Sequence, residues 1–245
     1  MNLKTEEPRV AIVTGASSGI GLGAAQALLE RGYRVVGNSR TITKSRDLKP
    51  SPNLALVDGD ISKKDTAIKV ASAAIQQFGR IDLLVNCAGI FLVRPFTEYT
   101  EEDFVKMIGT NVAGYFFITQ QAVGQMRKQK SGHVVSISTF MTDQPLADAP
   151  VSLPVLTKST IPAFSRALAM EFAQEGIRAN TISPGVVDTP MHANDDHEAL
   201  ARTHPIRRLV RISEIVDALF YLESAGMVTG ENLRIDGGAH AGAKW

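Results

Sequence analysis

Cysteine is almost absent from this chain, since Cys87 is the only one among 245 residues. An internal disulfide is therefore impossible, which is typical of a protein kept in a reducing cytoplasm. No apolar stretch reaches the length that spans a membrane, and residues 1–7 lack the apolar core of a signal peptide. We expect a cytoplasmic protein whose first seven residues form a frayed tail.

An excess of charge of either sign is also missing. The chain carries 26 basic and 25 acidic residues, so nothing in its charge predicts a nucleic-acid or membrane partner. Repeats and low-complexity segments are missing too. With 44% hydrophobic residues the chain can bury a substantial core, and we expect a single domain over residues 1–245.

The first motif that is present is a strand, a glycine turn and a helix. Val10–Val13 is a short apolar run, and Gly15, Gly19 and Gly21 follow before a helical pattern that ends at Gly32. This order points free N–H groups and the positive end of a helix dipole out of the carboxyl end of a strand. Such a place can bind a phosphate, although an ordinary strand–helix connection has the same local pattern.

Strand and helix patterns then alternate along the chain. This alternation predicts an α/β fold, a Rossmann-like doubly wound parallel sheet of about seven strands with helices on both faces. Ligands of such sheets bind across the carboxyl ends of the strands. Residues 190–211 are polar and irregular and predict a mobile flap over a substrate. Further strands are expected at 33–37, 54–57, 81–85, 133–138, 177–182 and 232–235, and further helices at 62–78, 100–129, 153–174 and 213–223. Ser62 with Asp65 and Thr100 with Asp103 fit the capping-box pattern at the starts of two of these helices.

The end of the second expected strand bears on the choice of dinucleotide. Ser39 stands where an acidic residue would accept a hydrogen bond from a ribose 2′-hydroxyl, and Arg40 follows it. An arginine there favours a 2′-phosphate, so NADP(H) is the favoured cofactor and NAD(H) stays possible. The alternative interpretation of Arg40 is a solvated surface arginine.

Together these motifs resemble the short-chain dehydrogenase/reductase family over essentially the whole chain. Thr14–Gly21 looks like the family's T-G-x-x-x-G-x-G turn, and Asn86–Gly89 is similar to its N-N-A-G turn, with Cys87 as a small departure. Pro184–Thr189 resembles the segment that cradles the nicotinamide. The resemblance implies cofactor contacts from Gly15, Ser17, Ser18, Gly19, Ile20, Gly21, Ser39, Arg40, Asp60, Ile61, Asn86, Ala88, Gly89, Lys158, Pro184, Gly185, Val187 and Thr189.

The chemistry that the resemblance implies is reversible hydride transfer between a nicotinamide and a carbonyl or alcohol carbon. In the family a serine polarises the substrate oxygen, a tyrosine four residues before a lysine transfers the proton, and an asparagine anchors a water. Here Lys158 and Asn111 match, and the serine position falls on Thr139. Pro154 stands in place of the tyrosine, and proline has no proton to give.

Three interpretations of that departure stay open. Another group supplies the proton: Lys158 itself, a water held by Asn111, or a flap side chain such as His192. Alternatively, the small-molecule substrate needs little acid catalysis, as a polarised double bond or an imine would. In the third interpretation the protein binds NADP without turnover, as a sensor or an assembly partner.

The flap also holds a group of residues that superficially resembles a metal site. His192, Asp195, Asp196 and His197 lie close together in the sequence, but a polar run of this kind is typical of a solvated flap, and no metal is expected. The family resemblance further implies a homo-oligomer, a tetramer or a dimer, packed through the two long helices.

Overall fold

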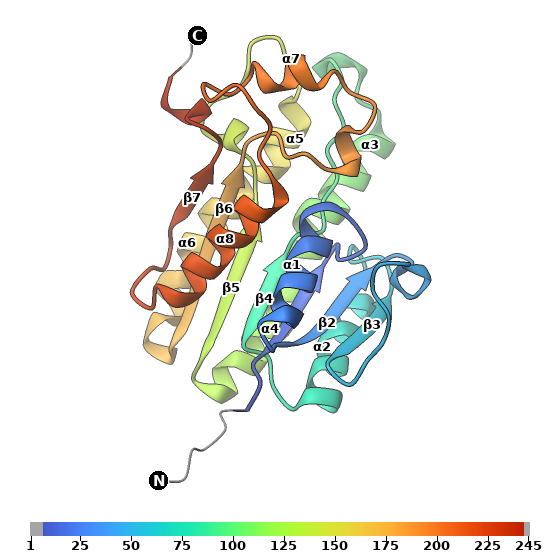
Figure 1. The fold of residues 1–245 in the computed structure, drawn as a ribbon, viewed down its shortest axis with the longest axis vertical. Coiled ribbons are helices and arrows are strands. Elements are labelled where there is room, and N and C mark those ends of the chain that lie inside the picture. Colours follow the sequence, from blue (N-terminus) through green and yellow to red (C-terminus); the bar gives the residue numbers. More distant parts are fainter. Residues whose placement is uncertain (1–6, 243–245) are drawn as a thin grey trace.

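The computed structural model describes residues 7–242, so residues 1–6 of the expected frayed tail lie outside the described residues. Seven parallel strands form one sheet in the order β3-β2-β1-β4-β5-β6-β7 (Figure 1). Every predicted strand is present, with ends within two residues of the prediction, and the doubly wound α/β fold is confirmed. The strands are β1 (Val10–Thr14), β2 (Arg34–Ser39), β3 (Leu54–Asp58), β4 (Leu83–Asn86), β5 (Gly132–Ile137), β6 (Ile177–Pro184) and β7 (Asn232–Ile235).

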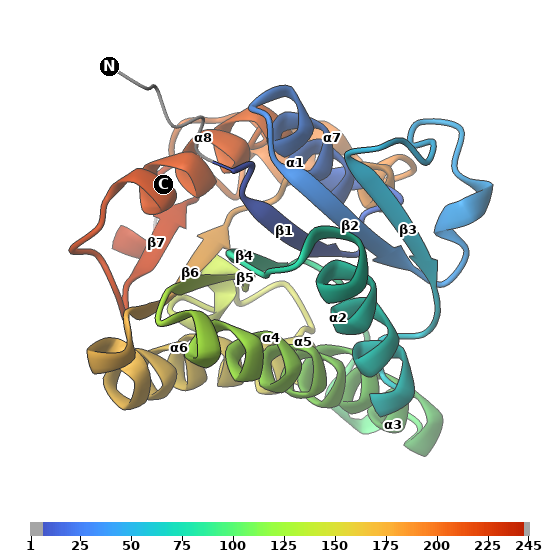
Figure 2. The same ribbon diagram turned by 90° about the horizontal axis from the view of Figure 1, so that it is seen from below.

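Helices cover both faces of the sheet, as Figure 2 shows. Helices α1 (Gly19–Glu30) and α8 (Ile212–Ser224) lie on one face, and α2 (Lys64–Phe78), α4 (Tyr115–Gln129) and α6 (Thr160–Phe172) lie on the other. Strand β1 pairs with both β2 and β4, so the order of the strands reverses beside it. This is the switch point at which open parallel sheets bind ligands.

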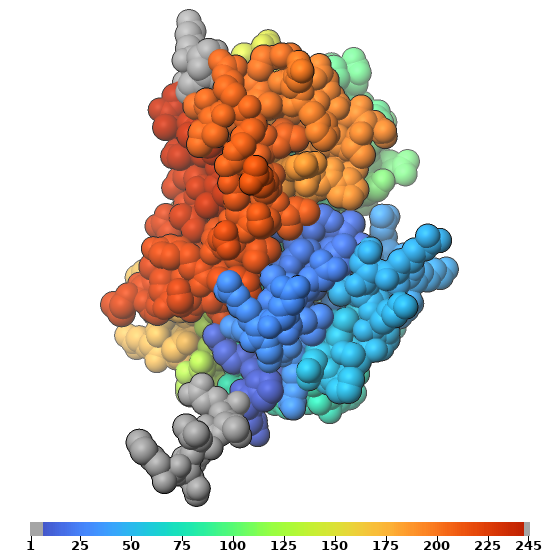
Figure 3. Space-filling model, viewed as in Figure 1, coloured from blue at the N-terminus to red at the C-terminus, as the bar shows by residue number. Residues whose placement is uncertain are grey.

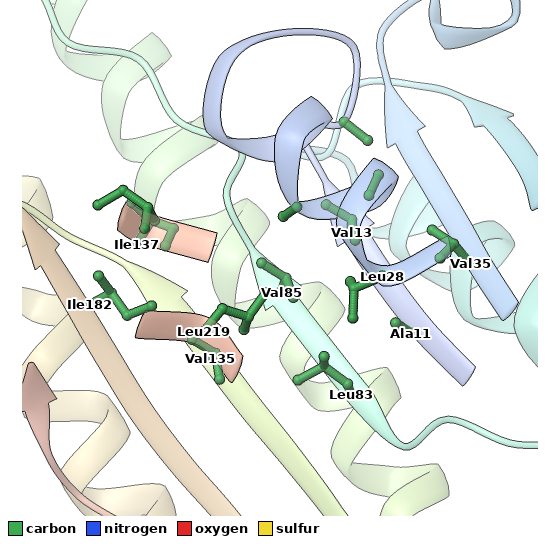
Figure 4. Close-up of a cluster of buried hydrophobic side chains, with 14 of the residues drawn as sticks. Ala11, Val13, Leu28, Val35, Leu83, Val85, Val135, Ile137, Ile182 and Leu219 are labelled. Atoms are coloured by element: carbon green, nitrogen blue, oxygen red, sulfur yellow. The ribbon is translucent and has the colours of Figure 1, made fainter. Parts of the chain in front are cut away.

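Alternating side chains of the strands build two cores. In β1, Ala11 and Val13 belong to the cluster on the α1 and α8 side, while Val10 and Ile12 belong to the cluster on the opposite side. Figure 4 shows the first cluster, in which Val85 of β4 and Leu219 of α8 meet these side chains. Burial on both faces explains why the strands are continuous apolar runs in the sequence.

The long helix predicted over residues 100–129 consists of three segments. Helix α3 (Glu101–Ile108) begins with the expected Thr100–Asp103 capping box, and a π-helical turn, Gly109–Gly114, joins it to α4. Gly114 packs so closely on the loop after β3 that a Cβ there would lie 2.9 Å from Cγ2 of Ile61. The expected Ser62–Asp65 capping box is wrong, because Ser62 donates its N–H to Asp60 and α2 begins only at Lys64.

The helix predicted over residues 153–174 is interrupted one turn before Pro162. Helix α5 (Ser152–Lys158) and helix α6 are separated by Ser159 alone. Because Pro162 has no N–H, the carbonyl of Lys158 lacks its helical donor. The hydroxyl of Ser138 donates to that carbonyl instead, at 3.1 Å. Pro162 thus leaves the backbone carbonyl of Lys158 free to accept a hydrogen bond from Ser138 at the end of β5.

Residues 190–211 are irregular apart from short turns and α7 (His197–Ala201). In the space-filling view this orange segment lies over the upper part of the molecule and meets the blue segment that contains the glycine turn (Figure 3). Val210 pairs with Val187 at one end of the segment, so the flap is joined to the loop after β6. No helix in residues 7–242 has the length and apolarity to cross a membrane.

Candidate functional site

A cavity of about 410 Å³ lies over the carboxyl edge of the sheet. That volume is within the usual range for a small-molecule site. It is lined by residues from the turns after six strands, which the sequence separates widely. Most of the residues predicted for the site line it: Gly15, Ser17, Ser18, Gly19, Ile20, Ser39, Arg40, Asp60, Ile61, Ala88, Gly89, Thr139, Lys158, Pro184, Gly185, Val187 and Thr189.

The glycine turn has the shape that a diphosphate needs. Gly15 has φ +69°, and a Cβ on it would lie 2.9 Å from the backbone of Ala88. A Cβ on Gly21 would lie 2.3 Å from the carbonyl oxygen of Gly15, so only a glycine lets α1 pack this closely on the turn. Gly21 does not line the cavity. The side chain of Ser18 makes no capping hydrogen bond to α1. The first N–H groups of α1 therefore remain available to an anion.

The end of the cavity beside β2 and β3 contains a buried acceptor that the sequence analysis missed. Asn38 is buried at the end of β2 and donates from Nδ2 to the carbonyl oxygens of Val57 (2.9 Å) and Gly59 (3.3 Å). Its Oδ1 has no partner among the described residues, and Asn38 lines the cavity. A buried acceptor of this kind fits a ligand that brings its own donor. The only signal in the sequence was a polar residue at the end of an apolar strand.

Lys158 lies at the other end of the cavity and is 7% exposed. Its Nζ donates to the carbonyl oxygen of Ile137 at 2.9 Å, and burial lowers its pKa to about 8. A Cβ on Gly89 would come within 2.9 Å of that Nζ, so the small residue after β4 leaves room for the ammonium. The turn after β4 can therefore pack against the lysine of α5 only because residue 89 has no side chain.

Asn111 lies outside the cavity lining and forms hydrogen bonds with two neighbouring segments. Its Nδ2 donates to the carbonyl of Ile90 (2.9 Å) and to Oγ1 of Thr157 (3.0 Å), and its Oδ1 accepts from the N–H of Ile90 (2.9 Å). Both amide hydrogens are therefore used within the protein. The π-helical turn places Asn111 between the loop after β4 and the residue before Lys158. Asn86 also lies outside the lining and donates to Thr119.

The two hydroxyls after β5 have different surroundings. Ser138 donates to the carbonyl of Lys158, as described above. The Oγ1 of Thr139 accepts from the N–H of Met141 at 3.4 Å, which leaves the hydroxyl proton of Thr139 without an acceptor among residues 7–242. Thr139 is thus the hydroxyl that can donate a hydrogen bond into the cavity.

No tyrosine replaces the missing one. Pro154 is buried in the first turn of α5 and does not line the cavity. Tyr115 is buried between Ser136 and Ser165, with its hydroxyl 3.2 and 3.3 Å from their oxygens. The other three tyrosines also lie outside the lining. Cys87 does line the cavity, but burial raises the pKa of its thiol to about 11.

The remaining lining residues are mostly apolar, with two ionisable side chains, Lys106 on α3 and His192 on the flap. His192 lines the cavity, and its Nδ1 lies 2.7 Å from Oδ2 of Asp195. Within residues 7–242 no three His, Cys, Asp or Glu side chains are grouped closely enough to hold a metal ion. The apolar side chains are Ile90, Phe91, Ile137, Phe140, Met141, Val186, Pro190 and Met191.

Comparison with known proteins assigns this architecture to a family. A family model described as enoyl-(acyl carrier protein) reductase matches residues 15–240. The chain therefore belongs to the short-chain dehydrogenase/reductase family of NAD(P)-dependent oxidoreductases, as its motifs predicted.

Individual relatives are similar over almost their whole length. Acetoacetyl-CoA reductase from an Acinetobacter species is 34% identical over 248 residues, which cover 96% of this chain and 98% of the relative. A solved gluconate 5-dehydrogenase from Burkholderia cenocepacia, in complex with NADP and tartrate, is 25% identical with a TM-score of 0.87 and 96% of each chain covered. The structure of ElxO with NADP bound is 27% identical with a TM-score of 0.86, covering 96% of this chain and 100% of ElxO.

Proposed function

We propose that this chain is an NADP(H)-dependent oxidoreductase that transfers a hydride between the nicotinamide and a small carbonyl or alcohol, or a polarised C=C or C=N bond. The observation that carries the proposal is one continuous cavity that joins the glycine turn at α1 to Lys158 and Thr139. In open sheets of this kind a dinucleotide lies along the carboxyl edge of the strands, with its diphosphate at the first glycine turn.

The preference for NADP(H) rests on Arg40. Its side chain is exposed at the rim of the cavity and forms no ion pair with the described acidic residues. A guanidinium without a carboxylate partner suits a ribose 2′-phosphate. The ElxO and gluconate 5-dehydrogenase structures, which are similar to this chain, hold NADP.

The roles at the reacting end follow from the residues that line it. When bound, a reduced nicotinamide supplies the hydride. Lys158 would hold the nicotinamide ribose, Thr139 would donate a hydrogen bond to the substrate oxygen, and Asn111 would position the segments around Lys158. The apolar walls formed by Phe91, Phe140 and Met191 suit an uncharged substrate. The proton donor would differ from the tyrosine of the family, because Pro154 stands in the tyrosine position and no tyrosine lines the cavity.

Binding and turnover should be measured separately. We expect NADPH to bind more tightly than NADH in isothermal titration calorimetry. We expect NADPH oxidation, followed by its absorbance, with some member of a panel of ketones, quinones, enones and cyclic imines. Binding without turnover on the whole panel would favour the alternative, an NADP-binding sensor or assembly partner. Failure to bind either dinucleotide would refute the proposal.

We also propose a single-domain cytoplasmic homo-oligomer, a tetramer or a dimer, in which residues 190–211 move over the substrate. The packing surface would be the face of α4 and α6, where Phe116 is 44% and Met170 84% exposed. Light scattering coupled to size-exclusion chromatography tests the oligomeric state. A monomer at micromolar concentration would contradict this part of the proposal.

A further inference from the structure

The cavity lacks the usual proton donor, so the groups that line it and can exchange a proton are of interest. Arg40 stays protonated in proteins, and Asp60 follows β3 at the adenosine end with Oδ1 engaged by the N–H of Ser62. Lys106 lies on α3, whose continuation at Gly109 packs against Ser62 in the loop after β3. Arg40 and Asp60 follow β2 and β3, which lie on the other side of β1 from β5, the strand that Thr139 follows.

The lining holds three further ionisable groups: Cys87 after β4, Lys158 on α5 and His192 on the flap. The thiol of Cys87 is held in its protonated form by burial, and its raised pKa makes it a poor exchanger of protons near neutral pH. The ammonium of Lys158 already donates to Ile137. His192 comes three residues after Thr189, at the end of the segment expected to cradle the nicotinamide. Its ring forms a hydrogen bond only with Asp195 among residues 7–242.

The geometry around His192 is that of an oriented imidazole. Its Nδ1 is hydrogen-bonded to Oδ2 of Asp195 at 2.7 Å, and its carbonyl oxygen is 2.9 Å from Nε2 of His197. A carboxylate on Nδ1 keeps a proton on that nitrogen, so Nε2 is the nitrogen that can give or take a proton. Nε2 has no hydrogen-bond partner among residues 7–242. The side chain is 24% exposed, which allows exchange with solvent.

We propose that His192, oriented by Asp195, is the proton donor and acceptor of this enzyme in place of the family's tyrosine. This inference rests on the proposed function. In the direction of reduction, the carbonyl carbon gains a hydride and the electron pair of the C=O bond moves to oxygen. That oxygen takes the proton from Nε2 of the His192 imidazolium and becomes a hydroxyl. The neutral imidazole then regains a proton from solvent. Thr139 donates a hydrogen bond to the same oxygen.

The chain contains a matched control for this pair. His240 also has its Nδ1 2.7 Å from an aspartate oxygen, Oδ2 of Asp236, and its side chain is 36% exposed against 24% for His192. His240 does not line the cavity. The two pairs therefore share the contact between Nδ1 and a carboxylate, and only one of them borders the cavity. His240 is the control for what this contact alone does to an accessible imidazole.

The first experiment needs no turnover. The full-length protein is treated with diethyl pyrocarbonate, with and without saturating NADP⁺, and the modified histidines are identified by peptide mass spectrometry. We expect NADP⁺ to reduce modification of His192 several-fold and to leave His240 unchanged. Equal modification of His192 with and without NADP⁺, under conditions in which calorimetry shows NADP⁺ bound, would place His192 away from the cofactor and overturn the proposal.

The second experiment measures catalysis with NADPH and phenanthrenequinone, ethyl acetoacetate or acetoacetyl-CoA as probes. We expect His192→Gln to lower kcat by about 10² to 10⁴, the range of a general acid. Asp195→Asn should lower kcat less and shift the pH dependence of kcat, which a structural role would not do. His240→Gln should retain the wild-type kcat, and NADPH should bind all variants within about threefold of wild type, under 0.7 kcal/mol.

The outcomes separate this inference from the function on which it rests. A wild-type chain that reduces a probe at the same rate as His192→Gln overturns the role of His192 and leaves the proposed function standing. A wild-type chain that binds NADPH and reduces neither these probes nor any member of the panel of ketones, quinones, enones and cyclic imines overturns both.

Discussion

The two ends of the cavity differ in how closely their residues follow the pattern of the family. At the phosphate end, the turn after β1 has its glycines where side chains would collide with Ala88 or with the turn itself. At the substrate end, Lys158 and Thr139 are in place, but the position four residues before Lys158 holds a buried proline. Holding a dinucleotide and delivering a proton are therefore separate demands on the same fold.

The difference has a physical origin. Phosphate binding uses backbone N–H groups, so it depends on the path of the chain and tolerates few side chains near that path. Proton delivery needs one titratable side chain within reach of one oxygen, and several elements can supply it. The flap, which carries His192, reaches the cavity from a different part of the sheet than α5 does.

The largest effect should follow removal of the buried lysine at the substrate end. Lys158→Met is expected to lower turnover at least 10²-fold, because it removes the buried cation beside Gly89. In the wild type, burial lowers the pKa of Lys158 to about 8, and a lysine is charged below its pKa. Turnover should therefore decline as the pH rises through 8. A pH–rate profile checks this, with Lys69→Met on the exposed side of α2 as the control. Full activity at pH 9 would contradict it.

A smaller effect, confined to the phosphate end, is expected from Arg40→Ala. The dissociation constant for NADPH should rise about 10- to 100-fold, or about 1.4 to 2.7 kcal/mol, with little change for NADH. The reason is that a guanidinium would be lost from beside the 2′-phosphate. Calorimetry with both dinucleotides measures it. Equal losses for NADPH and NADH would show that Arg40 does not read the phosphate.

The flap, residues 190–211, should make the free energy of unfolding depend on pH through His204. His204 is fully buried on the flap, and its Nε2 accepts from the N–H of Val186 at 2.9 Å. Burial lowers the pKa of His204, so the unfolded chain binds its proton more readily. This contribution to stability is present above the unfolded pKa of about 6.5 and is lost as the pH falls below it, by at most about 1.4 kcal/mol per pH unit.

Urea denaturation at pH 7.5 and 5.5 measures that dependence. The His204→Gln variant keeps an acceptor for Val186 but does not titrate, so its free energy of unfolding should fall less on acidification. Burial also lowers the pKa of His133, so part of the slope should persist in this variant. An identical slope in both proteins would exclude His204 as a source.

The smallest effect on catalysis is expected from restoring the family's residue. Pro154→Tyr should leave turnover within about threefold of wild type, because position 154 is buried outside the cavity. The larger side chain should instead lower the free energy of unfolding by about 1 to 3 kcal/mol through overpacking. Steady-state kinetics and thermal melts measure both. A large gain in turnover would show that the substrate end lacked only a hydroxyl.

Much of the cofactor end could be predicted from the sequence. The glycine spacing at Gly15 and Gly21 and the apolar run of β1 before them are local patterns. They depend only on residues that are close together in the sequence. Helix boundaries were less predictable where a distant contact decides them. Ser62 was expected to cap α2, but Asp60 takes its N–H.

The missed residues were all defined by contacts across the fold. Nothing adjacent to Asn38 indicates that its Oδ1 is left without a partner, because its two bonds go to β3 and the turn after it. Asn111 itself was predicted, but its hydrogen-bond partners Ile90 and Thr157, which belong to other elements, were not.

The sequence by itself determined the order of strands and helices and the glycine turn after β1, since periodicity and glycine act over a few neighbouring residues. Only the tertiary structure decided which side chains share the cavity: it kept Pro154 and Tyr115 out, gave Ser138 to the carbonyl of Lys158, and brought His192 in. The physical reason is that such contacts are settled by how elements far apart in the chain pack on one sheet, and no local pattern encodes that packing.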